Sequence, residues 1–456
     1  MPGARAKHQA IGLSIREAIS GGELAAGDRL PPVRDVAWRL GVTPGTVARA
    51  YKDLVDQEVL VSGVGRGTFV AGAARPAYPP AGLPYMMVAT PPDILNLSTA
   101  QVAHVGQGEV LHRLMLELPP PVGEDYVRYP VPEDDLVLRR FMAERSGGED
   151  HGQIEADDVV LTAGAQQALV TALMTVLHGP RPVILTEELS YPGIRHAAAL
   201  MRAEIRGVPL DDEGPLPEAF DRIAAETGAQ VFVTSANAHN PTTIQTSRAR
   251  REAVAEIVRA RGMQILEDDC FGYAQAGLPG YRLLVPERAW VATSLSKAIS
   301  PDLRLGALIG TPGRTIAART AAQQQFFGIP RPVRELVMRA METGAAEEIQ
   351  ARVKAKTQER VETTRAALGR FGIVTRDFVP FGWLPMPRGW RASSFLQAAE
   401  RQCIRLKPAD EFALIDGRAP NAVRLAFTAV AEDEAYAGAL RRLAALLDKP
   451  VVTMEA

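Results

Sequence analysis

A single lysine stands out in the central part of the chain. Lys297 is the only lysine between residues 53 and 353, and it follows the strand-like run WVATSLS. A primary amine can form a Schiff base with an aldehyde, whereas an arginine cannot. The nearby Ser294, Ser296 and Arg304 could donate hydrogen bonds to a phosphate. These residues predict amine chemistry on a phosphate-bearing aldehyde, with an ordinary surface lysine as the alternative.

Three other segments could bind the same ligand. Asp268 ends the run MQILED, where a carboxylate could keep a pyridine nitrogen protonated. Gly164 leads the strand VVLTAG into a helix whose first N–H groups, on Ala165 and Gln166, could stabilise a phosphate. Asn240, in SANAHNPTT, is suited to hydrogen-bond a phenolic ring oxygen. Each segment alone also has an ordinary structural explanation. Asp268 could be a solvated strand end, Gly164 a common strand-to-helix glycine, and Asn240 part of an Asn-Pro turn.

Strand-like and helical runs alternate from about residue 93 onward. DDVVLTAG precedes AQQALVTALMTVLHG, and RPVILTEE precedes YPGIRHAAALMRA. Such alternation predicts an α/β fold with a mostly parallel sheet, helices on both faces and functional groups at the carboxyl ends of the strands. We expect this large domain at residues 93–345 and a smaller C-terminal α+β subdomain at residues 346–456.

The first 72 residues predict three helices and a β-hairpin. Helical spacing over residues 8–20 ends at two glycines, and a second short helix ends at Gly41. Thr43 is a suitable N-cap for a third helix that has Pro44 at its first position. Strand formers at residues 59–61 and 68–70 then flank a glycine-rich turn. This order predicts a winged helix-turn-helix, followed by a Pro- and Ala-rich linker at residues 73–92.

The third predicted helix has one apolar and one polar face. Its apolar positions are Val47, Ala50, Tyr51 and Leu54. The polar face, with Thr46 and Arg49 and with Thr43 near its start, could enter a major groove. Arg34 could reach the DNA backbone, and Arg66 at the hairpin tip could contact a minor groove or a phosphate. Charges that are merely solvated would give the same pattern.

Composition narrows the possible function classes. Apolar residues make up 46% and charged residues 23% of the 456 positions, as in ordinary globular proteins of two to four domains. Residues 1–75 carry ten basic against seven acidic residues, while the whole chain has a net charge of −2. Two cysteines exclude a disulfide framework or a Cys-based zinc site, and the scattered histidines argue against any metal centre. Without an apolar signal core or spanning segment, we expect a cytoplasmic protein with no membrane partner.

The N-terminal segment resembles the GntR-type winged helix. The resemblance rests on GDRLPPVRDVA, the turn GVTPGTV and the wing GRGTFV, and it extends over nearly all of residues 1–72. It implies binding to double-stranded operator DNA. The residues that it implies at the DNA are Arg34, Thr43, Thr46, Arg49 and the wing around Arg66.

The remainder resembles fold type I pyridoxal 5′-phosphate (PLP) enzymes of the aspartate aminotransferase class, across residues 93–450. Six motifs occur in the family's order, namely GAQQAL, NPTT, EDD, SLSK, Arg304 and NAVRLAF. The resemblance implies that Lys297 holds PLP as a Schiff base, that Asp268 faces the pyridine nitrogen, and that Arg424 binds a carboxylate. The other cofactor contacts that it implies are Ala165, Gln166, Asn240, Ser294, Ser296 and Arg304, Tyr191 beside the ring, and Tyr129 from across a dimer interface.

Two positions depart from the family pattern. Phe271 stands where a tyrosine usually donates to the ring oxygen, and Thr243 replaces the usual glycine of NPTG. Loss of the phenol hydrogen bond should raise the proton affinity of the Schiff base and weaken it as an electrophile. We therefore expect PLP binding to persist and transamination to be residual at most.

A GntR-type head joined to an aminotransferase-like body resembles the MocR-type transcriptional regulators. The resemblance implies a head-to-tail homodimer that senses an amino compound, which exchanges with Lys297 as an external aldimine and is anchored at Arg424. Two alternatives stay open. The chain could be an active PLP-dependent aminotransferase with an accessory DNA-binding head, or a DNA-binding protein whose body serves only for dimerisation.

Overall fold

The chain divides into two units at about residue 90. The computed structural model describes residues 4–24, 28, 30–56, 59–63, 67–70, 90–91, 93–123, 126–272, 277–311, 313–414 and 419–448. The units are Met1–Ala89, which we call the head, and Thr90–Ala456, which we call the body. No helix in the described ranges is both long and apolar enough to cross a membrane.

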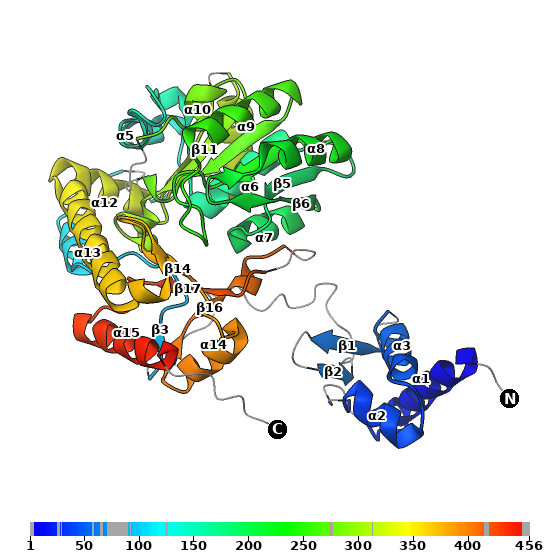
Figure 1. Ribbon diagram of the computed structural model, residues 1–456. Coiled ribbons are helices and arrows are strands. Elements are labelled where there is room, and N and C mark those ends of the chain that lie inside the picture. Colours follow the sequence, from blue (N-terminus) through cyan, green and yellow to red (C-terminus); the bar gives the residue numbers. More distant parts are fainter. Residues whose placement is uncertain are drawn as a thin grey trace. The chain divides into compact units, whose positions relative to one another are not determined.

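The described part of the head contains three helices and a two-stranded antiparallel sheet (Figure 1). These elements are α1 (Ala4–Ser20), α2 (Val33–Leu40), α3 (Pro44–Asp56), β1 (Leu60–Gly63) and β2 (Gly67–Val70). The predicted apolar face of α3 is buried, since Val47, Ala50, Tyr51 and Leu54 form the centre of the head with residues of α2 and the sheet. Gly41 ends α2 in the left-handed conformation that glycine adopts readily. The predicted winged helix-turn-helix is thus confirmed.

A seven-stranded sheet organises the body. Its strand order is β4-β12-β11-β10-β9-β5-β6, and β12 alone runs antiparallel to its neighbours. The strands are β4 (Val159–Thr162), β5 (Val183–Glu187), β6 (Glu204–Val208), β9 (Val231–Thr234), β10 (Gln264–Asp268), β11 (Ala289–Ser294) and β12 (Gly306–Ile309). This is the mostly parallel α/β sheet that the alternation of apolar runs predicted.

Helices cover both faces of this sheet (Figure 1). Alternate strand residues point to opposite faces, so Leu266 packs under one set of helices and Ile265 under the other. The first set is α6 (Ala165–Val176), α7 (Pro192–Leu200) and α11 (Thr315–Phe326); the second is α8 (Pro217–Thr227), α9 (Arg248–Ala260) and α10 (Tyr281–Leu284). Because both faces are buried, the strands read as continuous apolar runs rather than as alternating ones.

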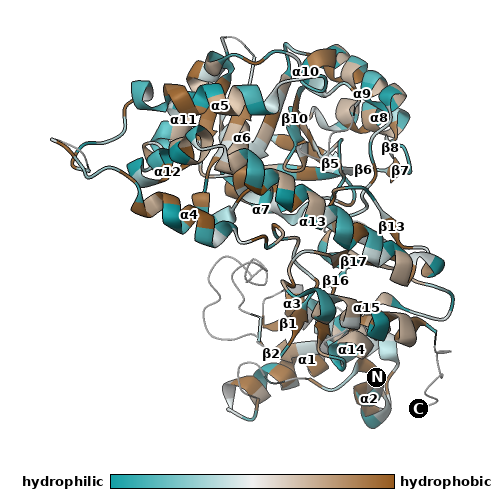
Figure 2. Ribbon diagram, turned by 90° about the vertical axis from the view of Figure 1, so that its left-hand side faces the viewer, coloured by the Kyte–Doolittle hydropathy of each residue, from teal (hydrophilic) through white to brown (hydrophobic). Residues whose placement is uncertain are grey.

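A third hydrophobic cluster lies beside the sheet at its β4 end. It is formed by α4 (Gln107–Leu116), α5 (Leu136–Ser146), α12 (Arg331–Glu342), the start of α13 (Ala345–Leu368) and the segment between β11 and β12. The helix α12 is amphipathic, with Leu336, Val337 and Ala340 buried and hydrophilic residues along its other face (Figure 2). This cluster supports the segment that carries Lys297.

The C-terminal subdomain has its own antiparallel sheet and core. The strand order is β13-β14-β17-β16, and α14, α15 and the second half of α13 supply the buried side chains. The elements are β13 (Val374–Thr375), β14 (Phe381–Pro385), α14 (Ala392–Glu400), β16 (Lys407–Pro408), β17 (Ala422–Ala426) and α15 (Asp433–Leu447). A short strand at the start of the body, β3 (Leu95–Asn96), pairs with β15 (Ile404–Arg405), so the chain segment after it runs along this subdomain.

Candidate functional site

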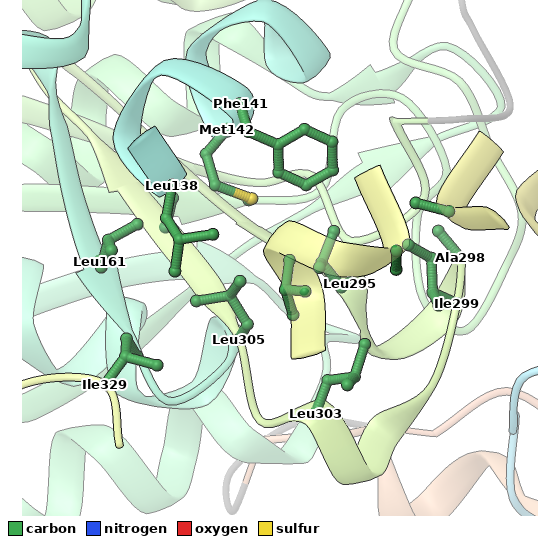
Figure 3. Close-up of a cluster of buried hydrophobic side chains, with 14 of the residues drawn as sticks. Leu138, Phe141, Met142, Leu161, Leu295, Ala298, Ile299, Leu303, Leu305 and Ile329 are labelled. Carbon is green, nitrogen blue, oxygen red and sulfur yellow. The ribbon is translucent and has the colours of Figure 1, made fainter. Parts of the chain in front are cut away.

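The segment that carries Lys297 is held by apolar anchors (Figure 3). It links β11 to β12 through two short 3₁₀ turns, Leu295–Lys297 and Pro301–Leu303. Its apolar side chains are buried against α5 and β4, and they are Leu295, Ala298, Ile299, Leu303 and Leu305. Because these anchors alternate with the polar residues, burial of the former directs the latter to the other side of the segment.

The amine of Lys297 lies in a part-buried position at the carboxyl ends of the strands. Its Nζ donates a hydrogen bond to the carbonyl oxygen of Ala100. Burial lowers the pKa of Lys297, the cationic Arg424 lowers it further, and Asp268 partly opposes the change. A lysine with a lowered pKa supplies more of the neutral amine that attacks an aldehyde.

Asp268 ends β10 close enough to Lys297 for their charges to interact. Burial raises the pKa of this carboxyl to about 6, although the lysine opposes that rise. Its Oδ1 is buried and has no hydrogen-bond partner among the described residues. A buried carboxylate oxygen without a partner is costly, so this atom fits an absent donor such as a protonated ring nitrogen.

The opposite end of the site suits a phosphate. Gly164 precedes α6 with φ of 90° and ψ of 172°, and a Cβ there would lie 2.8 Å from a guanidinium nitrogen of Arg304. That guanidinium donates to the carbonyl oxygen of Ala163. Gly306 of β12 also leaves room only for a hydrogen, since its Cβ would lie 2.8 Å from Gly164 Cα. The glycines therefore bring Arg304 against the N-terminus of α6, where anions are stabilised.

Hydroxyl and amide groups border this phosphate end. The Ser294 hydroxyl accepts from the Ser296 backbone N–H at 3.0 Å and contacts the Ser296 hydroxyl at 2.8 Å. Gln166 uses its Nε2 to donate to the Gly193 carbonyl at 3.0 Å, while its buried Oε1 has no partner among the described residues. Sequence reasoning assigned Gln166 only through its backbone and missed this side-chain link. The link brings the start of α7, capped by Tyr191, beside the start of α6.

Arg424 reaches the same site from the C-terminal subdomain. Its guanidinium donates to Asn240 Oδ1 at 2.8 Å and to the carbonyl oxygen of Ser98 at 2.6 Å. The side chain is 2% exposed, and its positive charge lowers the pKa of Lys297. The structure thus brings Asn240 and Arg424 together. Because Asn240 accepts through its oxygen here, its amide nitrogen is the group that would donate to a ligand.

Two aromatic rings hold the Arg424 guanidinium, which sequence reasoning missed. Its central carbon lies 5.3 Å from the Phe381 ring centroid and 4.8 Å from that of Phe412. The two rings come from strands and turns far apart in the chain, so no local spacing could reveal them. Cation–π contacts fix the plane of the guanidinium, which favours planar recognition of a carboxylate.

The two departures from the family pattern are both buried in the site region. Phe271 packs edge-on against Phe381, with ring centroids 5.4 Å apart, in a cluster that includes Ala100. It offers no hydroxyl to a ring oxygen. Thr243 adopts a left-handed conformation with φ of 65°, and its buried hydroxyl has no partner among the described residues. The backbone shape of the usual glycine is therefore kept at a cost in strain.

Tyr129 lies apart from these residues. It is 74% exposed and stacks on Phe327, with ring centroids 5.0 Å apart. A role at the phosphate through a second copy of the chain stays a prediction.

In the head, the polar face of α3 is accessible. The Thr43 and Thr46 hydroxyls lie 2.9 Å apart at the start of the helix, and Arg49 is exposed one turn later. Arg34 belongs to α2, but its side chain lies outside the described residues, as does Arg66 with the tip of the wing. These positions fit the N-terminal end of a recognition helix.

Comparison with known proteins identifies both parts of the chain. Residues 92–443 match the model for aminotransferase class I and II, and residues 7–70 match that for bacterial regulatory proteins of the gntR family. The chain belongs to the aminotransferase class I and II family. Its head is a gntR-type DNA-binding domain.

Both regulators and enzymes occur among the relatives. The uncharacterized HTH-type transcriptional regulator YdeF of Bacillus subtilis is 23% identical over 447 residues, covering 97% of this chain and 94% of the relative. The 2-aminoadipate transaminase of Thermus thermophilus is 27% identical over 333 residues, covering 70% and 81%. An archaeal alanine:glyoxylate aminotransferase superposes with a TM-score of 0.68 at 23% identity, covering 78% and 90%, and shares the fold.

Family membership indicates PLP as the cofactor, and the residues present fit it. The unpartnered Asp268 Oδ1 suits the pyridine nitrogen, and the Gly164–Arg304 contact places a cationic group at the N-terminus of α6, which suits a phosphate. PLP supplies an aldehyde for amines and an electron sink. Lys297 would hold the aldehyde, while Ala165, Ser294, Ser296 and Arg304 would bind the phosphate.

We predict that Gly164→Ala weakens PLP binding at least about tenfold, because a Cβ must displace the Arg304 guanidinium. Gly179→Ala is the matched control, since Gly179 has φ of 77° but nothing within 4 Å of the added atom. Both variants share the strain of a positive φ. Titration of cofactor-free protein with PLP, followed by visible absorption, measures the difference. Equal affinities of the two variants would contradict the assignment of the phosphate end.

We predict that Asp268→Asn stabilises the cofactor-free protein at pH 8 by about 1–3 kcal/mol and weakens PLP binding. The folded-state pKa of Asp268 lies above the ordinary carboxyl value, so its stabilising contribution is present at low pH and is lost as the pH rises through about 6. The gain from the variant should therefore shrink between pH 8 and pH 5. Thermal unfolding at both pH values, with the exposed Asp212→Asn as control, tests this; a pH-independent effect would contradict it.

Proposed function

We propose that the protein is a PLP-dependent transcriptional regulator of the MocR type that acts in the cytoplasm. The observation that carries the proposal is the presence in one chain of a gntR-type head and a body whose Lys297, Asp268 and Arg304 fit PLP. In this proposal the head binds operator DNA through α3. The body senses a small amino compound.

The body's own residues suggest how such an effector is bound. Arg424, in contact with two aromatic rings, would bind the effector's carboxylate or a similar anion. The effector's amine would take the place of Lys297 at the aldehyde carbon, and the released lysine amine could keep or return a proton there. Asn240, already bonded to Arg424, would link the anion site to the ring oxygen.

The effector's influence on the head is a matter of linkage. An effector shifts a conformational equilibrium only as far as its affinity differs between the two states. Arg424 lies in the C-terminal subdomain, and Lys297 lies in the large one. A molecule that binds both groups contributes affinity only in the arrangement that brings them together, so it favours that arrangement of the body.

A homodimer is part of the proposal. Large apolar side chains are exposed along residues 115–131 and at residue 327, namely Met115, Leu116, Val122, Tyr126, Val127, Tyr129, Val131 and Phe327. Exposed apolar patches of this kind mark protein–protein contacts. A two-fold dimer places two heads on two DNA half-sites, and it would let Tyr129 reach the other copy's phosphate. The head-to-tail arrangement rests on the resemblance to MocR-type regulators.

A specific observation favours a second function, that of an active aminotransferase. The 2-aminoadipate transaminase of Thermus thermophilus resembles the body over 333 residues. Phe271 and the strained Thr243 weigh against efficient turnover here. Steady-state assays of the PLP-loaded protein with amino donors and keto acids separate the two functions. Spectral change without repeated turnover supports the regulator, whereas many turnovers per active site support the enzyme.

We predict a double dissociation between the two units. Lys297→Ala should abolish the covalent PLP absorption band and leave affinity for DNA at low salt unchanged. Arg49→Ala should leave the band intact and weaken DNA binding by about 1–3 kcal/mol. A DNA fragment selected by the wild-type protein from a random pool serves as the probe, and Arg222→Ala, on the exposed face of α8, is the control. A normal band in the lysine variant would contradict the assignment.

We predict that a charge in the exposed apolar segment converts dimers to monomers. Val127→Glu adds a carboxylate to a residue that is 80% exposed in a single copy, and burying that charge in an interface is costly. Light scattering after gel filtration reports the mass. Val374→Glu, at another exposed apolar residue of the body, should have no effect. If the wild type is a monomer at micromolar concentration, the dimer proposal is wrong.

A further inference from the structure

The residue after Asp268 is held on three sides. The Asp269 side chain is 7% exposed, and its Oδ1 accepts from Asn237 Nδ2 at 3.1 Å. Its Oδ2 lies 3.2 Å from His151 Nε2. Its backbone N–H donates to the Ala292 carbonyl on β11 at 2.8 Å. The chain therefore leaves β10 in one direction.

The Asn237 side of this arrangement is rigid. Arg251 is fully buried and donates to Asn237 Oδ1 at 2.8 Å, to the Ala236 carbonyl at 3.0 Å and to the Thr246 carbonyl at 2.9 Å. A guanidinium has fixed donor directions. Asn237 thus presents its amide to Asp269 in one orientation.

The His151 side comes from a separate part of the chain. His151 lies in the turn before β4, where Gly148 and Gly152 exchange backbone hydrogen bonds of 3.1 and 2.7 Å. Its carbonyl oxygen accepts from Arg282 at 2.8 Å. Its ring is 3% exposed, and a Cβ on Gly280 would lie 2.7 Å from its Nδ1. Backbone and packing both restrict the imidazole.

Asp268 is supported by the residue two positions after it, because its carboxylate is hydrogen-bonded to the side chain and the backbone of Cys270. Its buried Oδ1 has no hydrogen-bond partner among the described residues, and the pairing of β10 with β11 ends at this residue. Adjacent residues of an extended chain point to opposite sides. Asp269 lies between Asp268 and Cys270 in the chain, so the contacts that hold Asp269 also place the Cys270 groups that orient the Asp268 carboxylate.

We propose that His151 is a positioning residue for the cofactor, which acts through Asp269 to aim Asp268 at the pyridine nitrogen. The proposal rests on PLP binding at Lys297. The ring of His151 bonds Asp269 rather than Asp268 or Lys297, and His151 lies outside the sequence motifs for the cofactor. In the described part of the chain, it is the one side chain in contact with Asp269 whose ordinary titration lies near neutral pH.

The charges around His151 give the proposal a distinctive readout. Burial lowers the pKa of His151, but the hydrogen bond to Asp269 and the charges of Glu267, Asp269 and Asp150 outweigh it and raise the pKa overall. Two cationic groups lie near these acids. Arg282 donates a hydrogen bond to the carbonyl oxygen of His151, and the Arg251 guanidinium lies 4.0 Å from the Glu267 carboxylate. Asp269 in turn raises the pKa of Asp268. A protonated His151 therefore offsets the charge of Asp269, and loss of that proton strengthens its effect on Asp268.

Two variants separate orientation from charge. His151→Ala removes both the hydrogen bond and the charge, so PLP affinity should fall at least about tenfold. His151→Gln keeps an amide donor for Asp269 without a charge, so affinity should stay within about threefold of wild type. The glutamine variant lacks the positive charge of protonated His151. Without that charge nearby, the protonated form of the PLP Schiff base is less disfavoured, so the pH midpoint of the visible PLP band should move upward.

The exposed His178 supplies the matched controls, His178→Ala and His178→Gln, which should leave affinity and midpoint unchanged. PLP titrations and spectra between pH 5.5 and 9 on the full-length protein measure both quantities, and thermal unfolding of the cofactor-free variants reports folding. If His151→Ala does not fold, the pH midpoint of the PLP band in His151→Gln alone tests the proposal. Wild-type affinity and midpoint in the folded His151 variants overturn the proposal; absence of PLP binding by the wild type overturns the proposed function instead.

Discussion

The body depends on keeping an amine close to a buried carboxylate at one edge of its sheet, where one oxygen of that carboxylate has no partner among the described residues. Burial lowers the pKa of Lys297 and raises that of Asp268, so it disfavours the charged form of each group. Both shifts reflect a cost of burial in the cofactor-free protein, and Asp268 Oδ1 adds to that cost because it has lost its hydration without gaining a hydrogen bond among the described residues. The arrangement becomes favourable when a ligand supplies the missing partners, which links folding of the site to its occupancy.

The surrounding structure can be understood as support for this pair. Burial of the apolar side chains in the 295–305 segment fixes the backbone that carries Lys297. The hydrogen bonds among Asp269, Asn237 and Arg251 fix the end of β10. Close glycine contacts hold Arg304 against α6. Arg424 comes from the other subdomain, so the anion site is complete only when the subdomains are apposed. A regulator and an enzyme both need such a site, and they differ in whether the bound amine is converted or only held.

The sequence alone was sufficient to predict the alternating α/β body, the winged head and the position of Lys297. These features arise from local patterns, namely apolar periodicity, caps and a lysine without neighbours of its type. The strand β12 was missed because it has only four residues and follows the two 3₁₀ turns of the Lys297 segment rather than a long helix. The aromatic clamp of Arg424, the Gln166–Gly193 link and the His151–Asp269 contact were missed for a common reason. Each joins residues that lie tens to hundreds of positions apart, and only tertiary packing brings them together.

The most direct test of the account is to reduce the PLP-loaded protein with borohydride and locate the label by peptide mass spectrometry. Reduction converts a lysine–PLP Schiff base into a stable secondary amine, which marks the attached residue. The account predicts a phosphopyridoxyl group on Lys297, and its loss when Asp268 or Arg304 is replaced under conditions of limiting PLP. A label on another lysine, such as the buried Lys407, or no label at saturating PLP, would contradict it.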